Sequence, residues 1–222
     1  MRFWPFSYIV KHTNSQLVSL NIEHTKPITT IELPAPNKNG GMSVSEALCK
    51  RRSIRNFSSE RISNQQLSDL LWSACGINGE RKNGDRSNYL HTNPTACNHQ
   101  EVMIYVFMKE GVYLYDSINN CLGQIKKKDF RTKLSKLSFV QNAAICLCLV
   151  SDISKMTRFD DKYRRDMYST LDIGYVSENI YLHCAANNLA TCACGLVNRE
   201  KIAYLLGLNR AKVFLVHPIG II

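Results

Sequence analysis

The chain has 222 residues, a formal net charge of +10 at pH 7, and 45% hydrophobic and 21% charged residues. This composition is typical of one globular domain with a sizeable core, and it excludes a disordered or fibrous chain. The positive charge favours anionic partners, either a phosphorylated small molecule or nucleic acid bound without sequence preference. No stretch reaches the ~18 apolar residues of a membrane-spanning helix, and the run Met1–Val10 lacks the small-residue cleavage site of a signal peptide. We therefore expect no membrane contact.

Residues 1–40 are polar and irregular, and they close with a stretch rich in proline and glycine, Leu33–Gly41. Such stretches are typical of linkers. The sequence therefore predicts an irregular N-terminal extension and linker over residues 1–42 and a single domain over residues 43–222.

Two capping boxes predict the first helices. Ser43-Val44-Ser45-Glu46 begins a helix that runs from Val44 to about Lys50, and Ser63-Asn64-Gln65-Gln66 begins the next. The second helix places its leucines on one face and ends at Gly76. The charged residues 79–86 are expected to form a loop.

The second half of the chain alternates strands and helices. The predicted strands are Glu101–Met108 and Val112–Asp116, joined as a hairpin, then a fully buried Ala143–Val150 and a last strand Val213–Val216. The predicted helices are Lys162–Asn187, a short Arg199–Leu206, and a solvated helix carrying the basic run that starts at Lys126. No Gly-x-Gly-x-x-Gly sequence follows a strand, which argues against a Rossmann site. The residues by themselves predict a mixed α+β fold.

The nine cysteines are scattered, mostly within apolar runs such as Ile145–Leu149. An odd number in this pattern indicates reduced, buried thiols in the cytoplasm rather than a disulfide framework. The Cys-x-Cys pairs at 146/148 and 192/194 lack the spacing of zinc knuckles, so we expect no metal site.

A cluster of three guanidinium groups and one hydroxyl lies just after the first predicted helix, in Arg51-Arg52-Ser53-Ile54-Arg55. Guanidinium is planar, permanently charged and able to bind two oxygens at once, so the cluster suits a phosphate dianion. Taken alone, a basic stretch of this kind is more often a solvated loop.

A second stretch further along, Pro94-Thr95-Ala96-Cys97-Asn98-His99-Gln100, changes that balance. The two stretches in this order resemble the FMN-dependent nitroreductase family. In that family an Arg-Arg-Ser-x-Arg segment holds the FMN phosphate, and a Pro-Ser-Ala-x-Asn-x-Gln segment lies along the isoalloxazine ring and ribityl chain. The resemblance covers residues 43–222, and the hydrophobic spacing is most similar to the branch of the SagB-type dehydrogenases.

The resemblance implies a nitroreductase-like α+β fold, with a central mixed or antiparallel sheet flanked by helices, in an intertwined homodimer. It implies an FMN site built from Arg51, Arg52, Ser53, Arg55, Pro94, Thr95, Ala96, Asn98, Cys194 and Gly195. A backbone N–H near Cys194 or Gly195 would point at flavin N5. Asn98 would contact the flavin or, on the residues alone, stabilise a turn after Pro94, and His99 and Gln100 would orient the loop.

The implied activity is a cytoplasmic, FMN-dependent, two-electron reduction of nitroaromatics, quinones or related electron-poor acceptors by NAD(P)H. Donor and acceptor would use the same flavin face in turn, which is a ping-pong mechanism. No catalytic side chain is required, because the cofactor carries the chemistry.

Three alternatives stay open. The first is a flavin-binding protein with little or no turnover, and the second is a SagB-like dehydrogenase acting on a peptide or another organic substrate. The third is a basic nucleic-acid binder, but the positive residues are spread along the chain and no motif for reading bases occurs.

Three positions depart from the family pattern. Thr95 replaces the commoner serine and keeps its hydroxyl. Ile221-Ile222 stands where relatives have Tyr-Pro followed by a further cation, so the phosphate would rely on the arginine cluster or on cations elsewhere. His91 stands where relatives carry arginine, and its role is open, as is that of the nearby Arg86.

Overall fold

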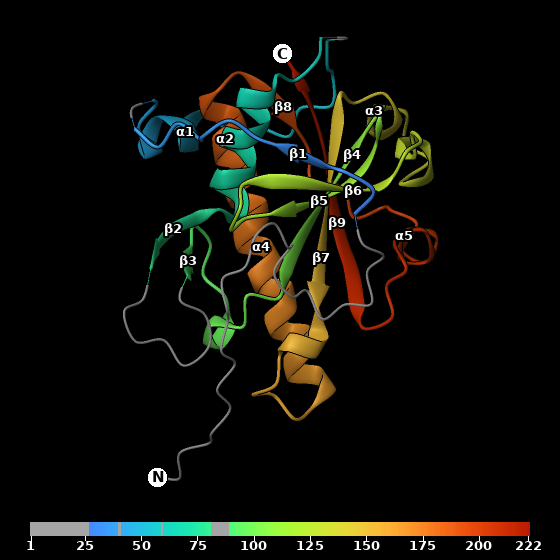
Figure 1. Cartoon of the computed structure of the whole chain (residues 1–222). Helices are drawn as coiled ribbons and strands as arrows, with labels where there is room; N and C mark the ends of the chain where they lie inside the picture. The colour runs from blue at the N-terminus through green and yellow to red at the C-terminus, as the bar shows by residue number, and fades with distance from the viewer. Residues whose placement is uncertain (1–26, 40, 59, 81–88) are drawn as a thin grey trace.

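The computed structural model of the chain describes residues 27–39, 41–58, 60–80 and 89–222. A seven-stranded sheet lies at its centre, and every pair of neighbouring strands in it is antiparallel. The strand order is β1-β6-β5-β4-β7-β9-β8 (Figure 1). The strands are β1 (Thr30–Glu32), β4 (Val102–Met108), β5 (Gly111–Asp116), β6 (Cys121–Lys126), β7 (Ile145–Asp152), β8 (Leu189–Thr191) and β9 (Ala211–Ile221). The predicted α+β class with an antiparallel sheet is confirmed.

Both faces of this sheet are buried. Successive side chains on a strand point to opposite sides, so each strand contributes to two cores. On β7, Ile145, Leu147 and Leu149 belong to one core, while Cys146, Cys148 and Val150 belong to the other. Helices α2 (Asn64–Cys75) and α4 (Lys162–Ala186) cover the first face, and α1 (Val44–Lys50) packs against α4. The short helices α3 (Ser138–Gln141) and α5 (Arg199–Leu206) cover the second (Figure 1). The continuous apolar run predicted as a central strand is therefore confirmed.

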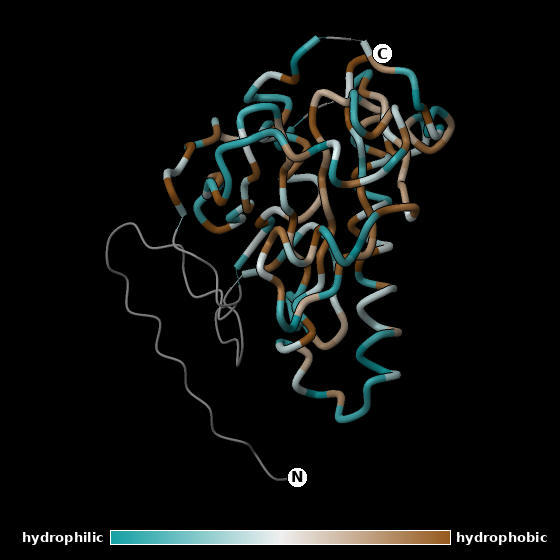
Figure 2. Tube along the Cα trace, turned by 90° about the vertical axis from the view of Figure 1, so that its right-hand side faces the viewer, coloured by the Kyte–Doolittle hydropathy of each residue, from teal (hydrophilic) through white to brown (hydrophobic). Residues whose placement is uncertain are grey.

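The helices begin where the capping residues predict. Ser43 and Ser63 each accept a hydrogen bond from the backbone three residues later, with the reciprocal bond also present. Helix α4 begins after Asp161 and is the longest, at 25 residues. Figure 2 shows it along one side of the molecule, with its first turns largely hydrophilic. Gly207, in the left-handed conformation, ends α5.

The prediction of an irregular linker is wrong for residues 30–33. Thr30–Glu32 pairs with β6 at the edge of the sheet, and Leu33 is buried in the core shared with α2 and α4. The Pro34 and Ala35 carbonyls accept hydrogen bonds from Ser68 and Gln65 of α2. The strand is too short to show an alternating pattern, and it is stable only because β6 supplies its partner. The division of the chain at residue 43 stays a prediction.

Three other expectations need correction. Lys126 ends strand β6 instead of beginning a helix, because residues 121–126 pair with β5. The last strand runs from Ala211 to Ile221, longer at both ends than predicted, since β7 and β8 both pair with it. Gly79 and Glu80 belong to a two-stranded sheet of β2 (Ile77–Glu80) and β3 (Tyr89–His91). The rest of the predicted loop, residues 81–86 with Arg86, lies outside the described residues.

All nine cysteines are unpaired, and seven of them are buried, so the prediction of core thiols holds for those seven. Among the described residues, no group of histidine, cysteine and acidic side chains is arranged to hold a metal ion. No helix in the described part of the chain has the length and apolar character needed to cross a membrane.

Candidate functional site

The arginine segment 51–55 runs in extended form from the end of α1 along the edge of the sheet. The Ile54 N–H donates to the Thr191 carbonyl at 2.9 Å. Further on, Ser58 N–H donates to Ile221 O at 2.8 Å, and Phe57 lies so close to Gly220 that any side chain at that position would collide with it. These contacts fix the segment against β8 and β9, beside the residues that follow β8.

Tyr181 of α4 joins the arginine segment to the Cys192–Gly195 stretch. Its hydroxyl lies 3.0 Å from Ser53 Oγ and accepts a hydrogen bond from the Ala193 backbone N–H at 2.8 Å. Sequence reasoning did not find this residue. It is adjacent to Ile180, in the buried stripe of α4, and nothing in the local pattern separates it from an ordinary core-flanking tyrosine.

Two of the three arginines contact aromatic rings. The Arg51 guanidinium carbon lies 5.5 Å from the centre of the Tyr181 ring, and that of Arg55 lies 5.9 Å from Phe139. No carboxylate among the described residues forms an ion pair with Arg51, Arg52 or Arg55. Their charge is therefore not neutralised within the described part of the chain and remains available to an anion.

Arg52 is turned away from the other two. Its Nη1 donates to the Cys49 carbonyl at 3.0 Å and to the Arg51 carbonyl at 2.7 Å. Together with Lys50 and Ile54 it borders a cavity of about 220 Å³ between α1, the end of α4 and Ile222. Alternate residues of an extended chain face opposite sides. The structure therefore directs Arg51, Ser53 and Arg55 to one side of the segment and Arg52 to the other.

Cys194 is one of the two residues whose backbone N–H was expected near flavin N5, and both of its backbone groups are hydrogen-bonded. Its N–H donates to Val216 O at 2.8 Å and its carbonyl accepts from Val216 N–H at 3.0 Å. A backbone N–H has one proton to donate, so this amide does not serve a ligand. Gly195 is exposed, and its N–H has no hydrogen-bond acceptor among the described residues. It is the remaining backbone donor of the predicted pair.

The loop containing Pro94–Gln100 has an unusual backbone. Cys97, Asn98 and Gln100 have φ values of 52°, 55° and 52°, a left-handed conformation that costs non-glycine residues energy and needs support from surrounding contacts. Gln100 supplies part of that support, because its backbone N–H donates to Thr95 Oγ1 and its side-chain amide donates to Tyr89 O and Asn98 Oδ1. His99, whose ring nitrogens contact Ala96 O and Arg158 N–H, supplies more. The expectation that His99 and Gln100 orient the loop is thus supported.

Asn98 leaves one polar group unsatisfied in this loop. Its Oδ1 accepts from Gln100, but its Nδ2 is buried and has no acceptor among the described residues. Buried amide donors rarely lack a partner. The arrangement favours the contact with a ligand over the turn-stabilising role.

The two predicted stretches are not brought together within one chain. The loop binds α4 through Asp172, which accepts from Ala96 N–H at 2.8 Å, whereas the arginine segment binds α4 through Tyr181. Nine residues of helix separate these two anchors, which corresponds to about 13.5 Å along the axis.

A group of buried charged residues lies beneath the loop. Glu101 is completely buried, and neither carboxyl oxygen has a hydrogen-bond partner among the described residues. Burial raises the pKa of Glu101 to about 8, and the negative charge of Asp172 acts in the same direction. Burial also raises the pKa of Asp172. Lys155 donates to the Gln100 carbonyl at 3.1 Å and is the cation on this side of the loop.

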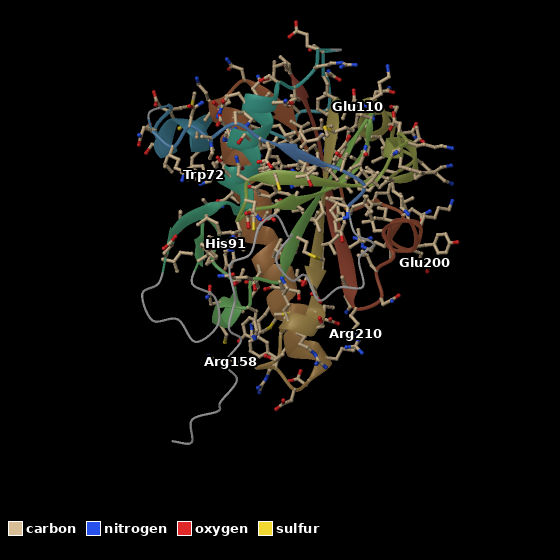
Figure 3. All side chains as sticks on the ribbon, in the orientation of Figure 1. Trp72, His91, Glu110, Arg158, Glu200 and Arg210 are labelled. Atoms are coloured by element: carbon tan, nitrogen blue, oxygen red, sulfur yellow. The ribbon has the colours of Figure 1, made fainter. Side chains whose placement is uncertain are left out.

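His91 lies on β3, on the same side of the molecule as Trp72 of α2 (Figure 3). Its Nδ1 lies 3.0 Å from the Cys75 carbonyl, and burial lowers its pKa. Because a carbonyl oxygen only accepts, Nδ1–H is the donor, and His91 links β3 to the end of α2.

Comparisons with known proteins agree on one family. The model of the nitroreductase family matches residues 48–221. A Ralstonia eutropha protein of known structure, provisionally named a nitroreductase, is 30% identical, with 88% of this chain and 93% of that one covered and a TM-score of 0.77. A Methanocaldococcus jannaschii protein, also provisionally named a nitroreductase, is 26% identical over 202 residues, covering 86% and 96% of the two chains.

A more distant structure shares the fold. It is the NADPH:FMN oxidoreductase of Vibrio harveyi in complex with NAD⁺, which is 16% identical, with a TM-score of 0.58 and coverage of 80% of this chain and 68% of that one.

Proposed function

We propose that this chain, which belongs to the nitroreductase family, is an FMN-dependent oxidoreductase that uses NAD(P)H to reduce nitroaromatics, quinones or related electron-poor acceptors. The observation that carries the proposal is the hydrogen-bonded link between the arginine segment 51–55 and the Cys192–Gly195 stretch. Ser53, Tyr181 and Ala193 form one hydrogen-bonded chain, so the arginine segment lies beside the Cys192–Gly195 stretch.

Three observations on this chain support FMN as the cofactor. Arg51 and Arg55 lack carboxylate partners in the described part of the chain, as a site for a phosphate dianion requires. The exposed Gly195 N–H has no acceptor among the described residues. The Asn98 amide is a buried donor that finds no acceptor in the part of the chain that the structure describes. When bound, FMN supplies the acceptance and release of hydride at its N5 atom.

Each part of the site has a task. Arg51 and Ser53 bind the phosphate through charge-assisted and neutral hydrogen bonds. Arg55 adds a second positive charge at the phosphate, and the Gly195 N–H donates to the ring edge. Thr95, Ala96 and Asn98, with Pro94, bind the ring and ribityl chain. Since donor and acceptor occupy one position in turn, no side-chain nucleophile takes part.

The separation of the two stretches on α4 supports a homodimer with two shared sites. Nine residues make about two and a half turns, so the loop anchored at Asp172 and the arginine segment anchored at Tyr181 lie on opposite sides of α4, and a second copy would supply the loop to the flavin. The α4 surface supports this assignment. Tyr163, Met167, Leu171 and Tyr175 are exposed at intervals of four residues, which places them on one stripe of the helix.

The nine unpaired thiols support a cytoplasmic location, because exposed and buried thiols persist there without oxidation.

The test is flavin content. The purified protein should show the absorbance bands of oxidised flavin and lose them when NADH or NADPH is added without oxygen. Arg51→Ala combined with Arg55→Ala should yield folded protein with little bound FMN. Lys127→Ala with Lys128→Ala is the matched control, because it removes the same charge from two exposed residues elsewhere. Full FMN occupancy in the Arg51/Arg55 variant would contradict the proposed site.

A further inference from the structure

The Tyr181 hydroxyl has two hydrogen-bond partners, one on each side of the proposed site. It accepts from Ala193 N–H at 2.8 Å and lies 3.0 Å from Ser53 Oγ. Ser53 is exposed and has no other hydrogen bond within the described residues. The hydroxyl of a tyrosine in the middle of a helix thus connects to the one neutral donor of the arginine segment.

In the bond between Tyr181 and Ser53 each hydroxyl carries one proton, and either can be the donor. A backbone N–H only donates, so the Tyr181 oxygen is the acceptor toward Ala193. The phenol has one proton of its own, and Ser53 Oγ is the acceptor that lies within reach in the described part of the chain. Half-buried tyrosine hydroxyls normally donate to a partner. The arrangement in which Tyr181 donates to Ser53 Oγ gives each proton of the pair its own acceptor and leaves the Ser53 proton free for a third group.

The Tyr181 ring is held on two sides, which fixes where its hydroxyl points. The Arg51 guanidinium lies over the ring face at 5.5 Å. His217 packs edge-on, with ring centres 5.3 Å apart at an angle of 80°. His217 is itself completely buried and held by Ser177 at 2.8 Å and Thr191 at 3.1 Å. The tyrosine therefore cannot rotate without moving either the cation or the buried histidine.

We propose that Tyr181 is a positioning residue that turns the Ser53 hydroxyl proton toward the phosphate of FMN, an inference that rests on the proposed function. Ser53 alone, exposed at the surface, would sample several rotamers. When one lone pair of Ser53 Oγ accepts the Tyr181 proton, the Ser53 proton points away from Tyr181, to the side shared with Arg51 and Arg55. The phosphate then receives a preoriented neutral hydrogen bond between two cations.

The experiment compares FMN with riboflavin, which differs only in lacking the phosphate. The flavin is removed from each protein, and FMN and riboflavin are titrated back while the flavin fluorescence is followed. Tyr181→Phe keeps the ring contacts and removes the hydroxyl. Tyr204→Phe is the matched control, because Tyr204 is 92% exposed on α5. Thermal unfolding of each variant establishes that it is folded.

We expect Tyr181→Phe to weaken FMN binding about tenfold, as for loss of one hydrogen bond to a charged group, and to leave riboflavin binding unchanged. Ser53→Ala should have the same selective effect, and Tyr181→Phe added to Ser53→Ala should cause no further loss. Unchanged FMN affinity in Tyr181→Phe, or an equal loss for both flavins, overturns the inference and leaves the proposed function standing. A wild-type protein that binds neither flavin overturns both.

Discussion

The Asp172 carboxylate accepts a 2.8 Å hydrogen bond from the backbone N–H of Ala96, 76 residues earlier in the chain. This bond ties the 94–100 loop, with its three left-handed residues, to the middle of the longest helix. Since left-handed non-glycine residues are unfavourable without such support, Asp172 is central to the shape of the loop.

Asp172→Ala should therefore be less stable than Asp172→Asn. Both variants remove the charge beside Glu101, but only asparagine keeps an oxygen that can accept from Ala96 N–H. We expect a difference of about 1–2 kcal/mol in the free energy of unfolding, as for one buried N–H left without an acceptor. Urea denaturation of the two variants measures it. Equal stabilities would show that the Ala96 bond does not support the loop.

Glu101 should make the protein less stable as the pH rises. Its pKa is raised from the ordinary 4.5 to about 8 by burial, so the folded state holds a proton that the unfolded state releases. Its contribution to stability is complete below about pH 4.5 and is lost progressively up to about pH 8. The buried histidines act oppositely, because burial lowers the pKa of His183 to about 4 and that of His217 to about 3. The effect of these histidines on stability is confined to pH values below 6.5, the ordinary pKa of a histidine.

The window from pH 6.5 to 8 therefore lies above the titration of these histidines and within that of Glu101. There the free energy of unfolding should fall by up to about 1.4 kcal/mol per pH unit in the wild type. Glu101→Gln carries no ionisable group and should show a nearly flat profile over the same window. Chemical denaturation at four or five pH values provides the measurement. Parallel profiles for the two proteins would mean that Glu101 is ionised in the folded state.

The exposed stripe on α4 should be the contact between two copies. Leu171 is 47% exposed and lies between Met167 and Tyr175 on that stripe. Leu171→Glu places a charge in an apolar interface and should convert a dimer into a monomer with reduced flavin content, as measured by light scattering and absorbance. Tyr204→Glu, on the exposed side of α5, should have no such effect. A wild-type monomer that carries flavin at micromolar concentration would rule out the shared site.

The Cys194 thiol should be dispensable for turnover. Its sulfur contacts the Leu196 carbonyl at 3.7 Å, and burial raises its pKa, so the thiol stays protonated. Cys194→Ser should retain most of the wild-type kcat. In both proteins, steady-state rates with NAD(P)H and a quinone or nitroaromatic should give parallel double-reciprocal lines. Loss of nearly all activity with flavin still bound would indicate thiol chemistry instead, and intersecting lines would exclude a single shared pocket.

Features that depend on neighbouring residues in the chain were predictable from the sequence. The capping boxes at Ser43 and Ser63 locate the starts of α1 and α2, because each bond spans only three residues. The unbroken apolar run before Ser151 indicates a strand buried on both faces, as β7 is. The arginine cluster and the Pro94–Gln100 stretch were recognisable for the same reason, since each is a compact set of residue types.

Only the tertiary structure decided how those local pieces act together. Thr30–Glu32 is a strand because β6 lies beside it. Lys126 ends a strand because residues 121–126 pair with β5. Arg52 turns away from Arg51 and Arg55, and the Cys194 amide is taken by Val216. Tyr181 gains its place from a bond to Ser53, 128 residues away. Such contacts depend on which distant segments meet, and a single sequence carries no local signal for a hydrogen bond across that separation.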